Sequence, residues 1–168
     1  MDNDELCRMI KLYHQTVYRA AYSLLQNAAE ADDVTQETFI KLFNDEKRFE
    51  SDEHCKAWLI RVAINLSKNL LRSFRYTRTE ELSETVPYNG EEENGIGEAL
   101  AKLPKKYRAV IHLYYFEGYS AKEIAGILGI SLSGATTRLS RARKKLKSLL
   151  TAEEKLPVNQ NTLTYKEG

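Results

Sequence analysis

The segment from residue 54 to residue 76 carries a stripe of cations interleaved with amides. Its members are Arg61, Asn65, Lys68, Asn69, Arg72 and Arg75. Spacings of three and four residues place them along one face of a helix. Cations can hold a nucleic-acid backbone while amides hydrogen-bond exposed bases, so the stripe predicts a surface for nucleic acid. Trp58 begins the same stripe, and we interpret it as a core residue rather than a stacking platform.

A helix-turn-helix pattern lies nearer the C-terminus. Ser120 and Glu123 have the spacing of a capping box, which opens a short helix. Ala125 is small enough for two helices to cross closely, and Gly129 suits a turn that needs a positive φ. Small residue, turn glycine and flanking aliphatic residues together predict a helix-turn-helix.

The second helix of this pattern is expected to be capped by Ser131 or Ser133 and to reach about residue 150. Its N-terminal half would meet base edges in the major groove, and its flanking cations would meet phosphates. The candidate DNA-binding residues are Ser133, Thr136, Thr137, Arg138, Ser140, Arg141, Arg143 and Lys144. Of these, the candidates for base reading are Thr137, Ser140 and Arg141, and those for phosphate contact are Arg138, Arg143 and Lys144.

Residues 32–39 (DDVTQETF) are acidic and polar. Asp33, Gln36 and Glu37 lie on neighbouring helical turns, where carboxylates could ligate a metal or act as an acid–base pair. No histidine, glycine-rich phosphate loop or activated nucleophile accompanies them, so an enzyme is disfavoured. We interpret this face as a docking surface for a basic protein partner.

Length and composition exclude several classes of protein. The chain has 168 residues, of which 42% are hydrophobic and 29% charged, a globular and not a disordered composition. No apolar run reaches the roughly 20 residues of a membrane span, and the acidic N-terminus lacks the pattern of a signal peptide. Cys7 and Cys55 are expected to be reduced thiols of a cytoplasmic protein. Neither a metal site nor a cofactor is predicted.

Charge is segregated although the net charge is only +1. Residues 79–98 carry 7 glutamates and no cation, whereas residues 99–150 carry 11 Lys+Arg against 2 Asp+Glu. The acidic stretch is expected to be an extended, self-repelling linker. We therefore expect a helical domain at 1–78, a flexible acidic linker at 79–97, a helix-turn-helix domain at 98–150 and a disordered tail at 151–168.

Apolar residues recur at helical spacing, and no alternating run suggests a strand, so the predicted fold class is all-α. Helices are expected over 6–24, 29–44 and 54–76, and from Leu103-Pro104 onward. The expected core positions of the first domain are Leu6, Ile10, Tyr13, Val17, Ala20, Leu24, Val34, Ile40, Phe43, Ala57, Ile60, Ile64, Leu71 and Phe74. Those of the second domain include Tyr107, Val110, Ile111, Tyr114, Ile124, Leu128, Ile130, Ala135, Leu139, Ala142, Leu146 and Leu149.

Three segments resemble regions of bacterial RNA polymerase sigma factors. Residues 31–42 (ADDVTQETFIKL) resemble region 2.2, residues 57–72 resemble regions 2.3–2.4, and residues 103–143 resemble region 4. Two such domains joined by a short linker, without regions 1.1 or 3, have the layout of the extracytoplasmic-function (ECF) subfamily of the sigma-70 family. Three motifs in this order argue against a chance match.

The resemblance implies a transcription initiation factor, not an enzyme, that binds core RNA polymerase, directs it to promoters and assists DNA opening. It implies as partners the polymerase β′ coiled coil and β flap, promoter DNA in double-stranded and locally single-stranded form, and an anti-sigma factor. Polymerase docking would use Asp33, Gln36, Glu37 and Phe39. The −10 element would be bound by Arg61, Asn65, Lys68, Asn69 and Arg72, with the loop 49–55 forming part of a pocket for a flipped base. The protein would be cytoplasmic, held at the membrane only through an anchored anti-sigma factor.

Two departures from the family's pattern concern DNA recognition. Many members have Asp at the position of Asn69, and many have Gly-Thr-Val-Lys-Ser-Arg where residues 133–138 read SGATTR. Gly134 weakens the first turn of the recognition helix, and Thr136 removes a phosphate-binding cation. Gly134 and Thr136 therefore both bear on which −35 sequence is read.

Two other functions stay open from the residues alone. A free-standing helix-turn-helix regulator would bind duplex DNA without polymerase, usually as a dimer. It would leave both the 33–39 face and the stripe of cations and amides without a purpose. A metal-dependent enzyme would need convergent ligands, and His14, His54 and His112 are scattered in the sequence.

Overall fold

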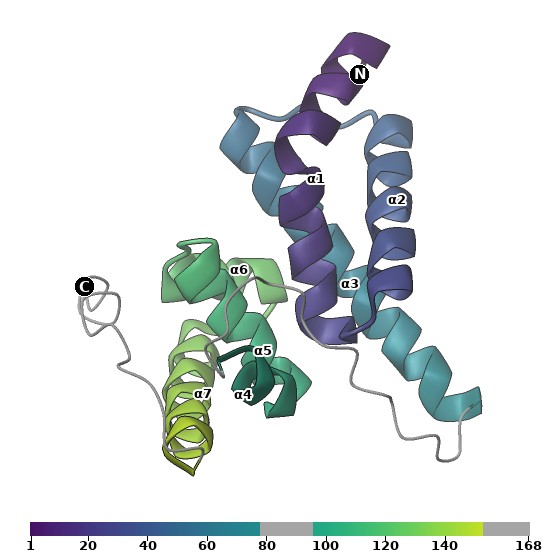
Figure 1. The fold of residues 1–168 in the computed structure, drawn as a ribbon. Coiled ribbons are helices and arrows are strands. Elements are labelled where there is room, and N and C mark those ends of the chain that lie inside the picture. Colours follow the sequence, from purple (N-terminus) through teal and green to yellow (C-terminus); the bar gives the residue numbers. More distant parts are fainter. Residues whose placement is uncertain (78–95, 153–168) are drawn as a thin grey trace. The chain divides into compact units, whose positions relative to one another are not determined.

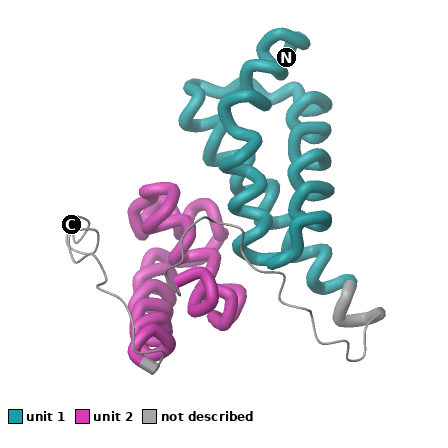
Figure 2. Tube along the Cα trace, in the orientation of Figure 1, with its two compact units in different colours: residues 1–84 teal, residues 85–168 magenta. Residues whose placement is uncertain are grey.

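The computed structural model describes residues 1–77 and 96–152, and every regular element in those ranges is a helix. The prediction of an all-α fold is therefore confirmed. The chain divides into two compact units, residues 1–84 and residues 85–168, which Figure 2 distinguishes by colour. Most of the predicted acidic linker (79–97), and the predicted tail from residue 153 onward, lie outside the described residues.

In unit 1, helices α1 (Asn3–Leu25), α2 (Ala28–Asn44) and α3 (Asp52–Thr77) pack against one another (Figure 1). Local signals set their ends. Asp2 caps α1 and Asn27 caps α2, each by accepting a hydrogen bond from the N–H three residues on, at 2.8 and 3.0 Å. Between them Gln26 adopts a left-handed φ of 51° and donates its N–H to the Tyr22 carbonyl oxygen, which ends α1.

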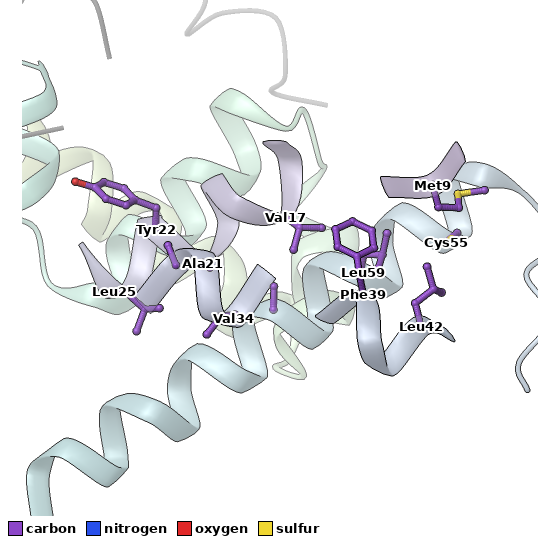
Figure 3. Close-up of a cluster of buried hydrophobic side chains, with 12 residues drawn as sticks. Met9, Val17, Ala21, Tyr22, Leu25, Val34, Phe39, Leu42, Cys55 and Leu59 are labelled. Atoms are coloured by element: carbon purple, nitrogen blue, oxygen red, sulfur yellow. The ribbon is translucent and has the colours of Figure 1, made fainter. Parts of the chain in front are cut away.

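The core of unit 1 is formed by side chains from all three helices (Figure 3). Its buried residues are Met9, Val17, Ala21, Tyr22, Leu25, Ala31, Val34, Phe39, Leu42, Cys55, Leu59 and Ala63. Thr35 and Thr38 are also buried, and each hydroxyl donates to the carbonyl oxygen four residues earlier at 2.7 Å. Because that bond satisfies the hydroxyl, the interior of the unit accommodates threonine.

The face that α2 turns to the core differs from the predicted one. Ile40 and Phe43 were expected in the core, but they are 53% and 48% exposed, whereas Phe39 is only 6% exposed. The buried positions of α2 are Ala31, Val34, Thr35, Thr38, Phe39 and Leu42. A pattern that counts only apolar residues omits the two threonines and therefore misplaces the buried stripe.

The described part of unit 2 begins with α4 (Ile96–Lys102) and α5 (Lys105–Ile111), and α5 continues into a π-helical turn, η1 (His112–Phe116). The sequence pattern predicts neither α4, which starts inside the expected linker, nor the π-helical turn. Arg108 is buried and donates to the carbonyl oxygens of Ala101 at 3.3 Å and Leu103 at 2.7 Å. It thereby serves carbonyl groups near the C-terminus of α4, where the helix supplies no donors of its own.

The helix-turn-helix follows, formed by α6 (Ala121–Leu128) and α7 (Leu132–Ala152) (Figure 1). The predicted capping box is confirmed. Ser120 Oγ accepts from the Glu123 N–H at 3.2 Å, and the Glu123 carboxylate accepts from the Ser120 N–H at 3.4 Å. Gly129 has the predicted positive φ, at 67°. Of the two serines considered for α7, Ser131 is the cap, with its Oγ accepting from the N–H three residues on at 2.9 Å.

The core of unit 2 draws on all these elements, and α7 packs against α4, α5 and α6. Its buried residues include Ala99, Leu103, Val110, Ile111, Leu113, Ile124, Leu128, Ala135, Leu139 and Ala142. The predicted buried stripe of α7 is therefore confirmed at its first three positions, while Leu146 and Leu149 are half-buried.

Candidate functional site

Helix α3 carries the predicted stripe of cations and amides on its outer side. Arg61, Asn65, Asn69 and Arg72 are exposed, and Lys68 is half-buried. The opposite side is buried in unit 1 through Leu59, Ile60, Ala63, Ile64 and Ser67. Burial of one side fixes the rotation of the helix, so the stripe forms a continuous exposed surface over more than two turns. The side chain of Arg75 lies outside the described residues.

The start of α3 is tied to α1 by an ion pair, and Phe49, which precedes the helix, packs on its first turns through aromatic contacts. Arg8 of α1 donates two hydrogen bonds to the Asp52 carboxylate, at 2.7 and 3.0 Å, and these bonds hold the pKa of Asp52 below its usual value. The Phe49 ring makes edge contacts with Trp58 and His54, with centroids 5.5 Å apart in each pair. Trp58 itself is half-buried and packs against the core of unit 1.

The outer side of α2 carries the three polar residues predicted for docking. Asp33, Gln36 and Glu37 are all exposed. Lys41 Nζ lies 3.6 Å from Glu37 Oε1, one turn away on the helix. Such an exposed pair is weak in water, so Glu37 can exchange this contact for a cation of a partner.

Phe39, the fourth residue predicted for docking, does not lie on that side. It is buried, and its ring stacks on His14 with centroids 6.5 Å apart. Ile40 and Phe43 are exposed instead, so acceptors and apolar side chains occur together on the outer side of α2. Helical spacing could have found both, because Ile40 lies one turn after Gln36 and Phe43 one turn after Ile40.

Most of the residues predicted to bind duplex DNA are on the exposed surface of α7. Those exposed are Ser133, Thr136, Thr137, Ser140, Arg141 and Lys144. Arg138 and Arg143 are half-buried, and Arg143 donates its Nε–H to the Tyr115 hydroxyl oxygen at 2.7 Å. The Thr136 hydroxyl donates to the carbonyl oxygens of Leu132 and Ser133, at 3.1 and 3.0 Å. It is therefore partly engaged by its own helix.

Gly134 lies close to the hydroxyl that caps α7. A Cβ atom at this position would lie 3.1 Å from Ser131 Oγ, the hydroxyl that caps α7. A residue with a Cβ atom would therefore require Ser131 Oγ to shift by a few tenths of an ångström. The glycine lowers helix propensity but leaves room for the capping hydrogen bond.

The described residues contain little that suggests other chemistry. Within residues 1–77 and 96–152, no three His, Cys, Asp or Glu side chains come together as a metal site would require. Cys7 is exposed, whereas Cys55 is buried, and burial raises the pKa of its thiol to about 11. No helix of this part of the chain is both long and apolar enough to cross a membrane.

Comparisons with known proteins agree with the geometry of both units. Residues 9–76 match the family described as Sigma-70 region 2, and residues 94–146 match Sigma-70, region 4. The chain is 30% identical to the ECF RNA polymerase sigma factor SigW of Bacillus subtilis, over 89% of this chain and 90% of SigW.

Two solved structures of sigma factors in complexes are also similar. The sigma factor RpoE, in complex with the anti-sigma factor NepR from Bartonella quintana, aligns with a TM-score of 0.72 and 25% identity. The alignment covers 88% of this chain and 97% of RpoE. CnrH, in complex with the cytosolic domain of CnrY, aligns with a TM-score of 0.66 and 28% identity over 90% of each chain.

Proposed function

Because this chain belongs to the ECF RNA polymerase sigma factors of the sigma-70 family, which direct RNA polymerase to promoters, we propose that it acts through one exposed face each of α2, α3 and α7. Sigma factors are transcription factors and not enzymes. The observation that carries the assignment of faces is the stripe on α3. A regulator that reads duplex DNA only through a helix-turn-helix has no need of exposed amides and cations on a helix in another unit.

The outer side of α2 is proposed to dock on the β′ coiled coil of core polymerase. Asp33, Gln36 and Glu37 offer acceptors to a basic partner, which favours encounter and orientation. Ile40 and Phe43 offer apolar area that binding would remove from water. Phe39 would then contribute from the core, by supporting the helix. Unit 2 is proposed to contact the β flap, as the family resemblance implies.

The stripe on α3 is proposed to bind the −10 element as an unstacked single strand. Arg61 and Arg72 would hold the backbone, while Asn65 and Asn69 would hydrogen-bond exposed bases. Extruding a base costs a few kcal/mol, which these contacts must offset. Lys68 would add to the positive potential. The segment 49–55, which was expected to be a loop but is helical from Asp52 onward, would form part of the pocket for the flipped base.

Helix α7 is proposed to read the −35 element in the major groove. Thr137, Ser140 and Arg141 would reach base edges, where a good bidentate contact is worth about 1–3 kcal/mol of discrimination. Arg138 and Lys144 would contact phosphates. Ser133 and Thr136, in the first turn, would lie where the helix enters the groove.

We further propose that residues 1–78 and 98–150 act as the two promoter-reading domains, joined by the segment 79–97, and that an anti-sigma factor inhibits the protein in the cytoplasm. The complex of RpoE with NepR supports this regulation, because an anti-sigma factor binds that similar protein. The similar protein CnrH is likewise bound by another protein, the cytosolic domain of CnrY.

The first experiment mixes the purified chain with bacterial core RNA polymerase. Gel filtration measures co-elution, and run-off transcription on genomic fragments of the source organism measures promoter-directed starts. We expect co-elution and new, discrete starts. Binding of duplex DNA by the chain alone, with neither co-elution nor starts, would instead favour the free-standing regulator.

Two variants then separate the faces. Asn65→Ala should reduce promoter opening by up to about 10-fold, because one hydrogen bond is lost, and leave polymerase binding intact. Glu37→Ala should weaken polymerase binding. Gln15→Ala, which removes an exposed amide from α1, is the matched control and should change neither. Loss of polymerase binding in all three variants would count against separate faces.

A further inference from the structure

Arg143 was predicted to contact a phosphate, but in the structure its side chain contacts other residues of the same chain. Its Nε–H donates to the Tyr115 hydroxyl oxygen at 2.7 Å, across 28 positions of sequence. Its guanidinium carbon lies 5.0 Å from the centre of the Tyr114 ring and 5.7 Å from that of Tyr115. The two rings meet edge to face, with centroids 4.9 Å apart. One hydrogen bond and two cation–π contacts therefore hold this side chain.

The tyrosines that receive Arg143 belong to the π-helical turn η1. In a regular α-helix, neighbouring side chains point about 100° apart, so two successive rings rarely face one group. The turn is widened here, with the Glu117 N–H donating to the His112 carbonyl oxygen five residues earlier at 3.1 Å. Such turns are rare and occur often at functional positions. In this chain the turn supplies both rings to a single guanidinium.

This contact joins α7 to the turn that precedes α6. η1 leads through residues 117–120 into α6, the first helix of the helix-turn-helix, and Arg143 lies in the middle of α7, the second helix. Arg141 and Lys144, its near neighbours, are exposed, whereas Arg143 is half-buried. A guanidinium held in this way has lost much of its freedom to follow a phosphate.

We propose that Arg143 is a positioning residue, which through Tyr115 and Tyr114 fixes how α7 is held against η1 and thereby where Thr137, Ser140 and Arg141 meet the −35 element. The inference rests on the proposed reading of the −35 element by α7. It replaces the phosphate contact predicted for Arg143. Lysine cannot take the same place, because it lacks the planar fork that donates to a hydroxyl while lying against aromatic rings.

Salt dependence distinguishes the two roles. A lost phosphate contact lowers the slope of log affinity against log salt by about 0.9, whereas a misplaced helix weakens specific binding and keeps the slope. The test uses holoenzyme formed with the full chain, on the promoter that run-off transcription identifies and on the same DNA with a scrambled −35 element. The variants are Arg143→Lys, Arg143→Gln and Tyr115→Phe, and Lys144→Gln is the matched control.

We expect Arg143→Lys, although it keeps the charge, to weaken promoter binding by about 10-fold, as loss of a charge-assisted hydrogen bond does. Arg143→Gln should weaken it similarly while leaving the slope nearly unchanged, and Tyr115→Phe should weaken promoter binding several-fold. Binding to the scrambled DNA should change little in all three. Lys144→Gln should lower the slope by about 0.9 on both DNAs.

The inference is overturned if Arg143→Lys binds like the parent chain while Arg143→Gln lowers the slope as Lys144→Gln does, since Arg143 would then be a phosphate contact. Tyr115→Phe with unchanged promoter binding would also overturn it. Thermal unfolding of each variant, with the parent transition retained in Tyr115→Phe, separates misplacement from loss of fold. Failure of the parent holoenzyme itself to prefer the intact −35 element would instead refute the proposed function.

Discussion

Two phenylalanines four residues apart on α2 are expected to have opposite roles. Phe39 is 6% exposed and belongs to the core of unit 1, whereas Phe43 is 48% exposed. Replacing each by alanine removes the same atoms from the same helix. The pair therefore isolates the effect of burial from that of chemistry and secondary structure.

The expected effect on stability follows from burial. Phe39→Ala should cost about 3–5 kcal/mol, because it leaves a cavity among Val17, Leu42 and Leu59 and their neighbours. A unit of this size has a total stability of about 4–12 kcal/mol, so its melting temperature should fall by about 12 °C or more. Phe39→Leu retains most of the volume and should lose less. Phe43→Ala should cost under about 1 kcal/mol.

The expected effect on polymerase binding is the reverse. Burying a phenylalanine fully is worth about 1.5–3 kcal/mol, so the half that Phe43 still exposes can contribute about 0.7–1.5 kcal/mol. Phe43→Ala should therefore raise the Kd for core polymerase by about 3- to 10-fold, measured below the melting temperature of the variant. Phe39→Leu should leave this Kd nearly unchanged.

Urea and thermal unfolding followed by circular dichroism measure the first effect, and titration of labelled chain with core polymerase measures the second. Equal destabilisation by Phe39→Ala and Phe43→Ala would refute the assigned orientation of α2. Weakened polymerase binding by Phe39→Leu at unchanged stability would restore Phe39 to the docking face.

Three further predictions concern single groups. At about pH 8 a thiol reagent should modify Cys7 quickly and Cys55 only after unfolding, because burial raises the pKa of Cys55 to about 11; modification of both at equal rates would contradict this. Gly129→Ala should cost about 1–2 kcal/mol in urea unfolding, since φ is 67° and a Cβ there would meet nothing within 4 Å; Gly129→Asn should cost less. Asp52→Asn should destabilise the chain slightly at neutral pH, and the difference from the parent should vanish as pH falls below 3.8, because the Arg8 hydrogen bonds lower the folded pKa of Asp52.

Local sequence signals determined where helices begin and end. The Ser120–Glu123 capping box and the positive φ of Gly129 both depend on residues within one helical turn, so spacing alone is sufficient to find them. The stripe on α3 was found for a similar reason. Arg61 and Asn65 lie outside the apolar stripe of this helix, and burial of that stripe determines which side of the helix faces water.

Periodicity was less reliable where polar residues enter the core. On α2 the hydroxyls of Thr35 and Thr38 bond to the backbone of their own helix, and both residues are buried. Ile40 and Phe43 were consequently placed on the wrong side of α2. The docking role expected of Phe39 came from the family resemblance, and its burial removes it from the outer side. Whether a threonine is buried depends on what packs against it, which is not a property of the segment itself.

The sequence by itself determined two helical units, a helix-turn-helix and which side chains carry charge. Only the tertiary structure decided what those charges face. Arg8 meets Asp52 across 44 positions and Arg143 meets Tyr115 across 28. Arg108 is buried and donates hydrogen bonds to two carbonyl oxygens, whereas Arg141 is exposed. The physical reason is that charge belongs to the residue, whereas exposure and hydrogen-bond partners depend on how distant segments pack.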